Sequence, residues 1–313
     1  GKIRARGVAM AMQGSSISNC DVGSVTVKLS DEGTYHITVG CTDMGTGCDT
    51  IIAQFAADVL ETPIDNISVY GVDTDISPYD SGSYASSTTY LTGMAAVKAC
   101  EQLRERIIAL AAVRMNKDAS ALTFDGENVI DESDGAKMSL FDIATASMCN
   151  NEISLEVTYS HSSPVSPPPF MAACAEIEAD PETGAIELLD YTACVDCGTV
   201  VNTNLARVQT EGGLLQGIGM TLYEDIWYDE RGKNLSNSFM QYKVPSRLDT
   251  DRIRVEFDSS YEPTGPFGAK SIGEIVINTA APAIADAVYN ATGVWINELP
   301  ITPEKILKGM KVI

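Results

Sequence analysis

A helical segment that carries four glycines constrains the fold of this chain more than any other feature. Residues 203–222, TNLARVQTEGGLLQGIGMTL, have the apolar periodicity of an α-helix, yet positions 212, 213, 217 and 219 are glycine. Each glycine costs a helix interior about 1 kcal/mol relative to alanine. Polar residues such as Gln209, Glu211 and Gln216 exclude a membrane-type glycine face. We therefore expect this helix to lie very close to a flat cofactor or to another backbone.

The composition limits the classes of partner. The 313 residues include 21 lysines and arginines against 43 aspartates and glutamates, a formal net charge of −22. Nucleic-acid binding depends on basic surfaces, so we expect no nucleic-acid partner. No apolar run has the length of a membrane span. The first residues, GKIRARGVAMAMQ, lack the apolar core of a signal peptide. We therefore expect a cytoplasmic protein with no membrane partner.

The order of apolar patterns predicts an α+β protein with two subdomains of mixed sheets and packed helices. A Ser/Pro-rich break, SSPVSPPPF (162–170), follows the expected boundary, which divides the chain into residues 1–155 and 156–313. Expected strands and hairpins lie at 22–40, 66–74, 171–180, 185–196, 223–238 and up to residue 258. Expected helices lie at 51–60, 91–113, 203–222 and 279–293, a last helix is capped by Thr302, and residues 118–152 are expected to form a small helical excursion.

Two loops rich in glycine or hydroxyl groups each lead into an expected helix. DMGTGCD (43–49) places a Gly-Thr-Gly turn where exposed N–H groups and the helix dipole favour an anion or a carbonyl-rich ligand. DSGSYASSTTY (80–90) offers a second such helix start. Alone, the first is better explained as a plain turn capped by Asp49, and the second as a surface loop. Together they favour one shared, oxygen-rich ligand.

CVDC (194–197) has a spacing that zinc and redox sites use. Strand positions three apart point to opposite faces, so the two cysteines are poorly placed for one ion. The sequence offers no second ligand pair beside them. We expect two buried thiols and no metal ligand here.

GPFGAKSIGE (265–274) leaves two explanations open. A P-loop is excluded because its lysine follows a glycine directly, and Ala269 intervenes here. A glutamate buried on a slim turn gains affinity for a proton and can act as a general base. Glu274 could equally stabilise the positive end of the helix dipole at 278–290.

Taken together, these stretches resemble the molybdenum hydroxylases, the family of xanthine dehydrogenase and aldehyde oxidase. Several motifs occur in the family's order and at fitting distances. They are GCTDMGTG (40–47), DCG (196–198), Asn202, QTEGG (209–213), QGIG (216–219), YKVP (242–245) and GAKSIGE (268–274). The resemblance covers the second half of the family's molybdopterin-binding region.

The resemblance implies a role for each matching residue. Glu274 takes the position of the catalytic base, and Gln209 and Lys270 those of pterin-contacting side chains. The matching cofactor-contacting positions are Gly45, Thr46, Gly47, Ala85, Ser86, Ser87, Thr88, Thr89, Gln209 and Lys270. Thr46 departs from the family, which has a glutamine there. No side chain is expected to bind the metal, because the pterin dithiolene holds it.

The resemblance also implies cofactors, partners and a reaction. We expect molybdopterin cytosine dinucleotide with molybdenum, in which selenium can replace sulfur as a terminal ligand. The expected partners are a larger molybdopterin subunit, an iron–sulfur subunit with 2Fe–2S clusters, a FAD subunit and a small heteroaromatic substrate. Chains of this size resemble the split molybdenum subunits of bacterial nicotinate dehydrogenase, so nicotinate is the expected substrate. A purine, an aldehyde or an aromatic thioester is the alternative, and a non-catalytic scaffold is the alternative from another class.

Overall fold

The computed structural model describes residues 1–150, 154–246, 248–249 and 252–313 and divides into two compact units. Unit 1 consists of Gly1–Gln13, Pro168–Ser260 and Ile272–Ile313, and unit 2 of Gly14–Pro167 and Tyr261–Ser271. These units differ from the two continuous segments expected from the sequence, because the first strand pairs inside unit 1. The subdivision at residue 155 into two molybdopterin-binding subdomains stays a prediction. The mixed α+β architecture is confirmed.

Unit 1 is built on a four-stranded sheet with the order β1-β9-β10-β11. Its strands are β1 (Ile3–Met12), β9 (Phe170–Ala179), β10 (Ile186–Asp196) and β11 (Ile253–Asp258). The first three run antiparallel, and β11 is parallel to β10. The expected strands at 171–180 and 185–196 are confirmed. β1 was not foreseen, because its partner β9 lies far along the chain.

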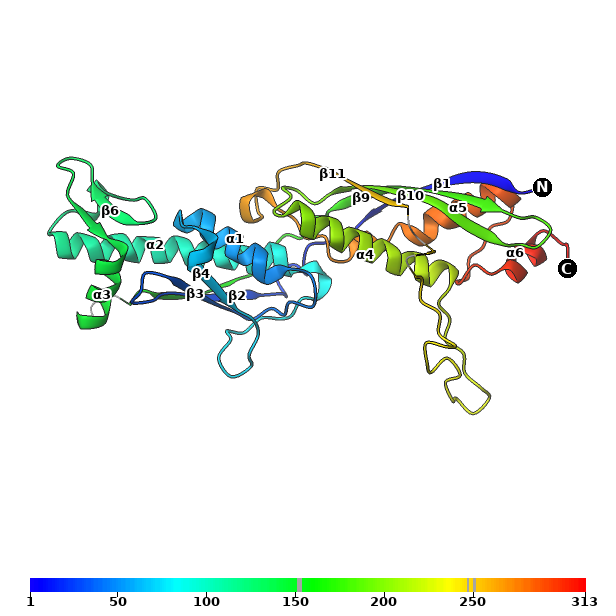
Figure 1. The fold of residues 1–313 in the computed structure, drawn as a ribbon, viewed down its shortest axis with the longest axis horizontal. Helices are drawn as coiled ribbons and strands as arrows, with labels where there is room; N and C mark the ends of the chain where they lie inside the picture. Colours follow the sequence, from blue (N-terminus) through cyan, green and yellow to red (C-terminus); the bar gives the residue numbers. More distant parts are fainter. Residues whose placement is uncertain (151–153, 247, 250–251) are drawn as a thin grey trace. The chain divides into compact units, whose positions relative to one another are not determined.

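Three helices complete unit 1: α4 (Thr203–Leu222), α5 (Ala280–Thr292) and α6 (Pro303–Gly309). In Figure 1, α4 and α5 cover the same face of the sheet. That face carries the apolar side chains of alternate strand positions, including Ile177 and Val195. A Cβ at Gly7 would collide with the backbone of Ala283 and Ala287, so glycine lets α5 rest directly on β1. Thr302 caps α6, as predicted, by accepting a hydrogen bond from Lys305.

Unit 2 is built on a second sheet, of the order β4-β3-β2-β8. Its strands are β2 (Gly23–Leu29), β3 (Tyr35–Val39), β4 (Ile67–Tyr70) and β8 (Glu156–His161). The helices α1 (Cys48–Leu60) and α2 (Gly93–Met115) pack on one face of this sheet (Figure 1). The predicted hairpin at 22–40 and both helices are confirmed. No helix in the described part of the chain is long and apolar enough to cross a membrane.

Two segments differ from expectation. Within the expected excursion at 118–152, residues 118–150 form a small three-stranded sheet as well as a helix, because short apolar runs there alternate with period two. Residues 151–152 lie outside the described part of the chain. Its elements are β5 (Leu122–Phe124), β6 (Asn128–Asp131), β7 (Lys137–Ser139) and α3 (Leu140–Asn150). Residues 223–238 form no regular hairpin; their described backbone shows one isolated bridge, between Tyr228 and Asn234. The short helical turns are η1 (Ile64–Asn66), η2 (Tyr84–Ser86), η3 (Thr88–Thr92), η4 (Ala119–Ala121), η5 (Pro266–Gly268) and η6 (Ile275–Ile277).

Candidate functional site

The loop that leads into α2 has a strained backbone. Ala85 and Ser86 lie in the left-handed region, with φ of 51° and 56°, although neither is glycine. Such conformations cost about 1–3 kcal/mol each and cluster at ligand-binding sites. The neighbouring Ser16, with φ of 85°, donates its N–H to the Ala85 carbonyl at 2.8 Å. The fold therefore holds two segments of unit 2 in unfavourable conformations against each other.

Buried hydroxyl groups without partners gather in the same part of unit 2. Among the residues that the structure describes, the side-chain oxygens of Ser16, Ser83 and Thr88 are buried and make no hydrogen bond. An unsatisfied buried hydroxyl costs about 1–3 kcal/mol. Two of these residues lie in the loop at 80–90, and the third lies beside Ala85. This arrangement suits a ligand with many oxygen or nitrogen atoms.

The buried Asp21 anchors the loop at 80–90 through a hydrogen bond. Asp21 accepts hydrogen bonds from the Ile17 N–H and from the Tyr84 hydroxyl, both at 2.7 Å. The hydrogen bond to the Asp21 carboxylate raises the pKa of the Tyr84 phenol to about 12. Tyr84 therefore stays protonated at neutral pH and serves as a structural donor.

The Gly-Thr-Gly turn before α1 folds around its own aspartate. Asp43 accepts hydrogen bonds from the N–H groups of Gly45 and Gly47, at 2.9 and 3.1 Å. Partial burial opposes ionisation of this carboxyl, but the backbone donors outweigh it and hold the Asp43 pKa below its ordinary value. Both glycines have positive φ, and a Cβ at Gly45 would meet nothing within 4 Å. The turn thus leaves open space beside Gly45, while two of its N–H groups are already used.

Lys270 is buried at the end of an extended segment of unit 2. The following residue, Ser271, donates its N–H to Ser15 Oγ and accepts from the Tyr90 N–H, each at 3.2 Å. Tyr90 in turn hydrogen-bonds Ser163 and Thr264 through its hydroxyl. This network holds the segment that carries Lys270 against the start of α2.

Glu274 lies in unit 1, immediately before η6. Its side chain is exposed in the described structure, whereas burial was one condition for its use as a base. Gln13, which directly follows β1, donates from Nε2 to Glu274 Oε2 at 3.3 Å. The Gln13 oxygen accepts from Asn278 at 3.4 Å. The Gln13 amide thus contacts the carboxylate directly, and Asn278 holds that amide in place.

Gly213 and Gly217 let α4 pack closely against the turn that follows Glu274. A Cβ at Gly213 would overlap the Val276 side chain, and one at Gly217 would lie 2.8 Å from the backbone carbonyl oxygen of Ile277. Gln209 on the same helix donates to the Gly273 carbonyl at 3.4 Å. Of the two explanations for this helix, close approach to another backbone is therefore observed. α4 therefore contacts residues on both sides of Glu274, namely Gly273 and Val276.

The cysteine and carboxylate clusters provide no separate site. Cys197 is buried but Cys194 is exposed, which corrects the expectation of two buried thiols: β10 alternates, and Cys194 points away from the helices. Asp43, Cys48 and Asp49 place one ligand atom each within 4.8 Å of the others. Asp43 is already bound by backbone N–H groups and Cys48 lies 3.9 Å from the buried Cys41 sulfur. Local contacts account for these side chains.

The structure assembles the predicted site residues as two groups. Gln209 and Glu274 belong to unit 1, and the other nine belong to unit 2. Sequence reasoning missed Gln13, Asn278, Ser16 and Ser83. A single glutamine or asparagine carries no motif, so only the pairing of β1 with β9 reveals that Gln13 reaches Glu274. Ser83 lies inside the hydroxyl-rich loop, whose composition was the available signal.

Residues 1–251 match the molybdopterin cofactor-binding domain family. The chain belongs to this family. It is 39% identical over 310 residues to the probable hypoxanthine oxidase XdhD of Escherichia coli K12, covering 98% of this chain and 32% of that protein. It is 32% identical to the 6-hydroxypseudooxynicotine dehydrogenase complex subunit gamma of Paenarthrobacter nicotinovorans, covering 96% of this chain and 39% of that one. The resemblance to the molybdenum hydroxylases is thereby confirmed.

Solved structures agree with the fold. The quinoline 2-oxidoreductase of Pseudomonas putida 86 superposes with a TM-score of 0.90 at 27% identity, over 99% of this chain and 42% of that one. This chain therefore spans about a third to two fifths of the relatives' length. The unpartnered hydroxyls of Ser16, Ser83 and Thr88 fit an oxygen- and nitrogen-rich cofactor of the kind this family binds.

Proposed function

We propose that this chain is the part of a molybdenum hydroxylase that contributes the proton-accepting carboxylate and one wall of the pterin site. The observation that carries the proposal is Glu274, placed on a turn by the glycine face of α4 and oriented by Gln13. When bound, the molybdenum cofactor supplies the redox chemistry and activates the oxygen that is transferred. The reaction inserts water-derived oxygen into an electron-poor carbon of a heteroaromatic ring.

In this proposal the protein groups bind, orient and accept a proton. Glu274 accepts, at a carboxylate oxygen, the proton released as the oxygen is transferred. Gln13 holds that carboxylate by its amide hydrogen bond. The buried Lys270 offers a positive charge and hydrogen-bond donors to the cofactor. The loops at 45–47 and 85–89 supply hydroxyl and backbone donors to it, and Gln209 holds the turn at Gly273.

The test replaces the carboxylate by its neutral isostere. Glu274→Gln is expected to keep its molybdenum and pterin content while kcat falls by about 10²–10⁴-fold, the usual contribution of a general base. Glu298→Gln, at an exposed glutamate, is the matched control and is expected to keep both cofactor and activity. A Glu274→Gln enzyme with wild-type kcat would remove Glu274 from the mechanism.

For the substrate we propose nicotinate, with a purine as the second candidate. The hypoxanthine oxidase and the quinoline oxidoreductase are both named after nitrogen heteroaromatic compounds, which supports a substrate of this class. The similarity to a probable hypoxanthine oxidase is the specific observation that supports a purine. Steady-state assays of the purified enzyme with nicotinate, hypoxanthine and xanthine decide between them through kcat/KM.

We further propose that the cofactor is molybdopterin cytosine dinucleotide and that electrons leave through 2Fe–2S and FAD subunits. A larger molybdopterin subunit completes the assembly. Elemental analysis of the enzyme for molybdenum, selenium and iron, together with nucleotide release and identification of co-purifying chains, tests each component. Absence of molybdenum and cytosine dinucleotide would favour the non-catalytic scaffold.

A further inference from the structure

One end of the face of the unit 1 sheet that points away from α4 and α5 is apolar. We call the whole face the outer sheet face. Outward positions of a one-sided antiparallel sheet are ordinarily polar. Here Val8, Met10 and Met12 on β1 are 62%, 79% and 67% exposed, and Phe170 on β9 is 44% exposed. The residues between them, such as Ala9, are buried towards the helices, so the strands keep their alternation.

The register makes these side chains one continuous patch. Met12 pairs with Phe170, Met10 with Ala172 and Val8 with Cys174. Ala172 pairs in turn with the exposed Cys194 on β10. Scattered apolar residues are normal on protein surfaces, but a contiguous exposed patch marks an interaction surface.

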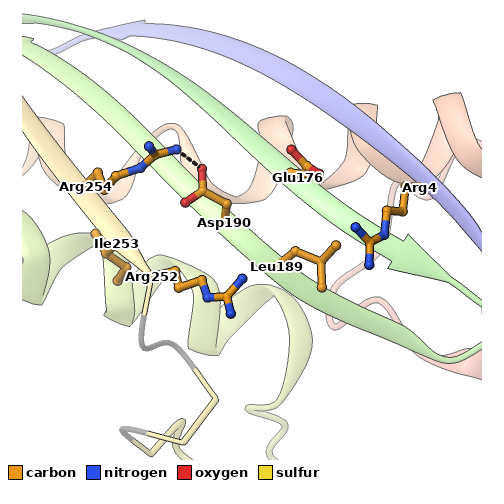
Figure 2. Close-up of a pocket in the computed structure, with 7 residues that line it drawn as sticks. All are labelled: Arg4, Glu176, Leu189, Asp190, Arg252, Ile253 and Arg254. Carbon is orange, nitrogen blue, oxygen red and sulfur yellow. Dashed lines mark hydrogen bonds and ion pairs between the residues drawn. The ribbon is translucent and has the colours of Figure 1, made fainter.

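The other end of the outer sheet face is charged and hollowed. A pocket here has a volume of about 570 Å³. Figure 2 shows the residues that line it: Arg4, Glu176, Leu189, Asp190, Arg252, Ile253 and Arg254. It forms where β10 carries a bulge around Leu189 and where β11 begins only opposite Tyr191. Three arginines and two carboxylates line the pocket, and Arg254 pairs with Asp190 within it.

A partner can dock on the outer sheet face but not along the free edge of β1, whose backbone groups at Arg6 and Val8 already have partners. On the free side of β1, the Val8 N–H already donates to Asp286, and the Arg6 carbonyl accepts from Asn290. Ion pairs of Arg6 with Glu176 and of Arg4 with Glu178 order the charged end. A partner that docks here therefore packs across the strands and does not extend the sheet.

From these features we infer that the outer sheet face is covered by the remainder of the molybdopterin-binding polypeptide. In the relatives described above, about three fifths to two thirds of the length lies outside the matched span, and that part has to pack against the matched part. The occupant presents an apolar surface to Met10 and Phe170 and inserts at least one carboxylate into the arginine-lined pocket. The inference rests on family membership and not on the substrate, so an active or inactive Glu274→Gln enzyme leaves it unchanged.

Native cysteines provide the first test, because Cys194 lies in the outer sheet face and is exposed, as is Cys20 in unit 2. The 313-residue chain and the holoenzyme from its natural source are treated with N-ethylmaleimide, and alkylation of each cysteine is followed by mass spectrometry. Cys194 is expected to react at least about tenfold more slowly in the holoenzyme than in the chain alone, since thiol reactivity follows exposure. Equal rates would refute the inference. In the chain alone, Cys20 reports the intrinsic reactivity of an exposed thiol, and the buried Cys100 must stay unreactive, which shows that the chain compared is folded.

A second measurement identifies the occupant within the holoenzyme and does not need the chain to fold alone. p-Benzoylphenylalanine replaces Met10, and irradiation is expected to cross-link it to the remaining molybdopterin-binding polypeptide. The same amino acid in place of the exposed Phe141 of unit 2 is the control and is expected to give different peptides. Cross-links from position 10 to a second copy of this chain, to an iron–sulfur or flavin subunit, or to nothing would each overturn the assignment.

A charge-reversal variant tests the arginine-lined pocket at the charged end of the outer sheet face. Arg252→Glu is expected to raise the alkylation rate of Cys194 in the holoenzyme about threefold or more, because a like charge then opposes the inserted carboxylate. Lys308→Glu makes the same charge change on α6 and is expected to leave that rate unchanged. An unchanged rate in Arg252→Glu would remove the carboxylate from the inference.

Discussion

Gln13 donates a hydrogen bond from Nε2 to Glu274 Oε2 over 3.3 Å, although 260 residues separate them in the chain. The contact exists because β1 pairs along its whole length with β9 and so brings its last residues to η6. Asn278 binds the other end of the same amide. The proposed base is therefore positioned by an amide that no sequence motif identifies.

Removal of that amide is expected to impair the reaction without loss of the cofactor. In Gln13→Ala the carboxylate keeps its charge but loses a long, exposed hydrogen bond from a neutral donor, worth about 1 kcal/mol, so kcat is expected to fall about two- to tenfold. Steady-state kinetics and molybdenum content of the purified enzyme measure this. Gln102→Ala, a half-buried glutamine on α2, is the control. Loss of molybdenum in Gln13→Ala would instead show that Gln13 supports the cofactor.

The two adjacent glycines of α4 are expected to respond to alanine with opposite signs. At Gly213 a Cβ would overlap Val276, and overpacking of this kind costs about 1–3 kcal/mol. At Gly212 nothing lies within 4 Å, so alanine is expected to stabilise the helix by about 0.5–1 kcal/mol. Urea denaturation measures both free energies of unfolding.

A second-site change separates packing from other effects at Gly213. Val276→Ala removes the atoms that the new Cβ would meet, so Gly213→Ala combined with Val276→Ala is expected to lose less stability than the two single changes predict together. Activity should follow the same pattern, because η6 begins directly after Glu274. Additive losses would show that Gly213 is required for its backbone and not for the space beside it.

Sequence reasoning succeeded where a pattern is local. The alternation of residues 22–40 predicts the β2–β3 hairpin, and four glycines in one helix predict a close neighbour. It failed where the decisive partner is distant, as for β1, whose residues show no strand signal without β9. The division into units is equally non-local, since residues 261–271 return to unit 2 through contacts such as Phe55 with Phe267.

The Asp43 turn is expected to stabilise the fold in a pH-dependent way. Its backbone donors hold the folded pKa below the ordinary value, so the contribution of the charge is present above the unfolded pKa of about 4 and is lost as the pH falls through the folded pKa. Asp43→Asn keeps an acceptor and loses the charge, so its deficit in the free energy of unfolding should shrink between pH 7 and pH 3. Asp43→Ala loses both and is expected to retain a deficit at either pH. A deficit of Asp43→Asn that does not change with pH would contradict the assignment.

Two threonines at the start of α2 distinguish a hydroxyl kept for a ligand from one kept for the fold. Thr88 Oγ1 is buried and makes no hydrogen bond within the described residues, whereas Thr92 Oγ1 donates to Asp80 at 2.9 Å. Replacing an unsatisfied hydroxyl by a methyl group is neutral or stabilising, so Thr88→Val is expected to keep or raise the free energy of unfolding of the cofactor-free chain and to lower the molybdenum content of the enzyme. Thr92→Val leaves the half-buried Asp80 carboxylate short of a donor and is expected to lose about 1–3 kcal/mol. Calorimetry of the chain and metal analysis of the enzyme give the two readouts. A Thr88→Val enzyme with full molybdenum content would show that this hydroxyl does not serve the cofactor.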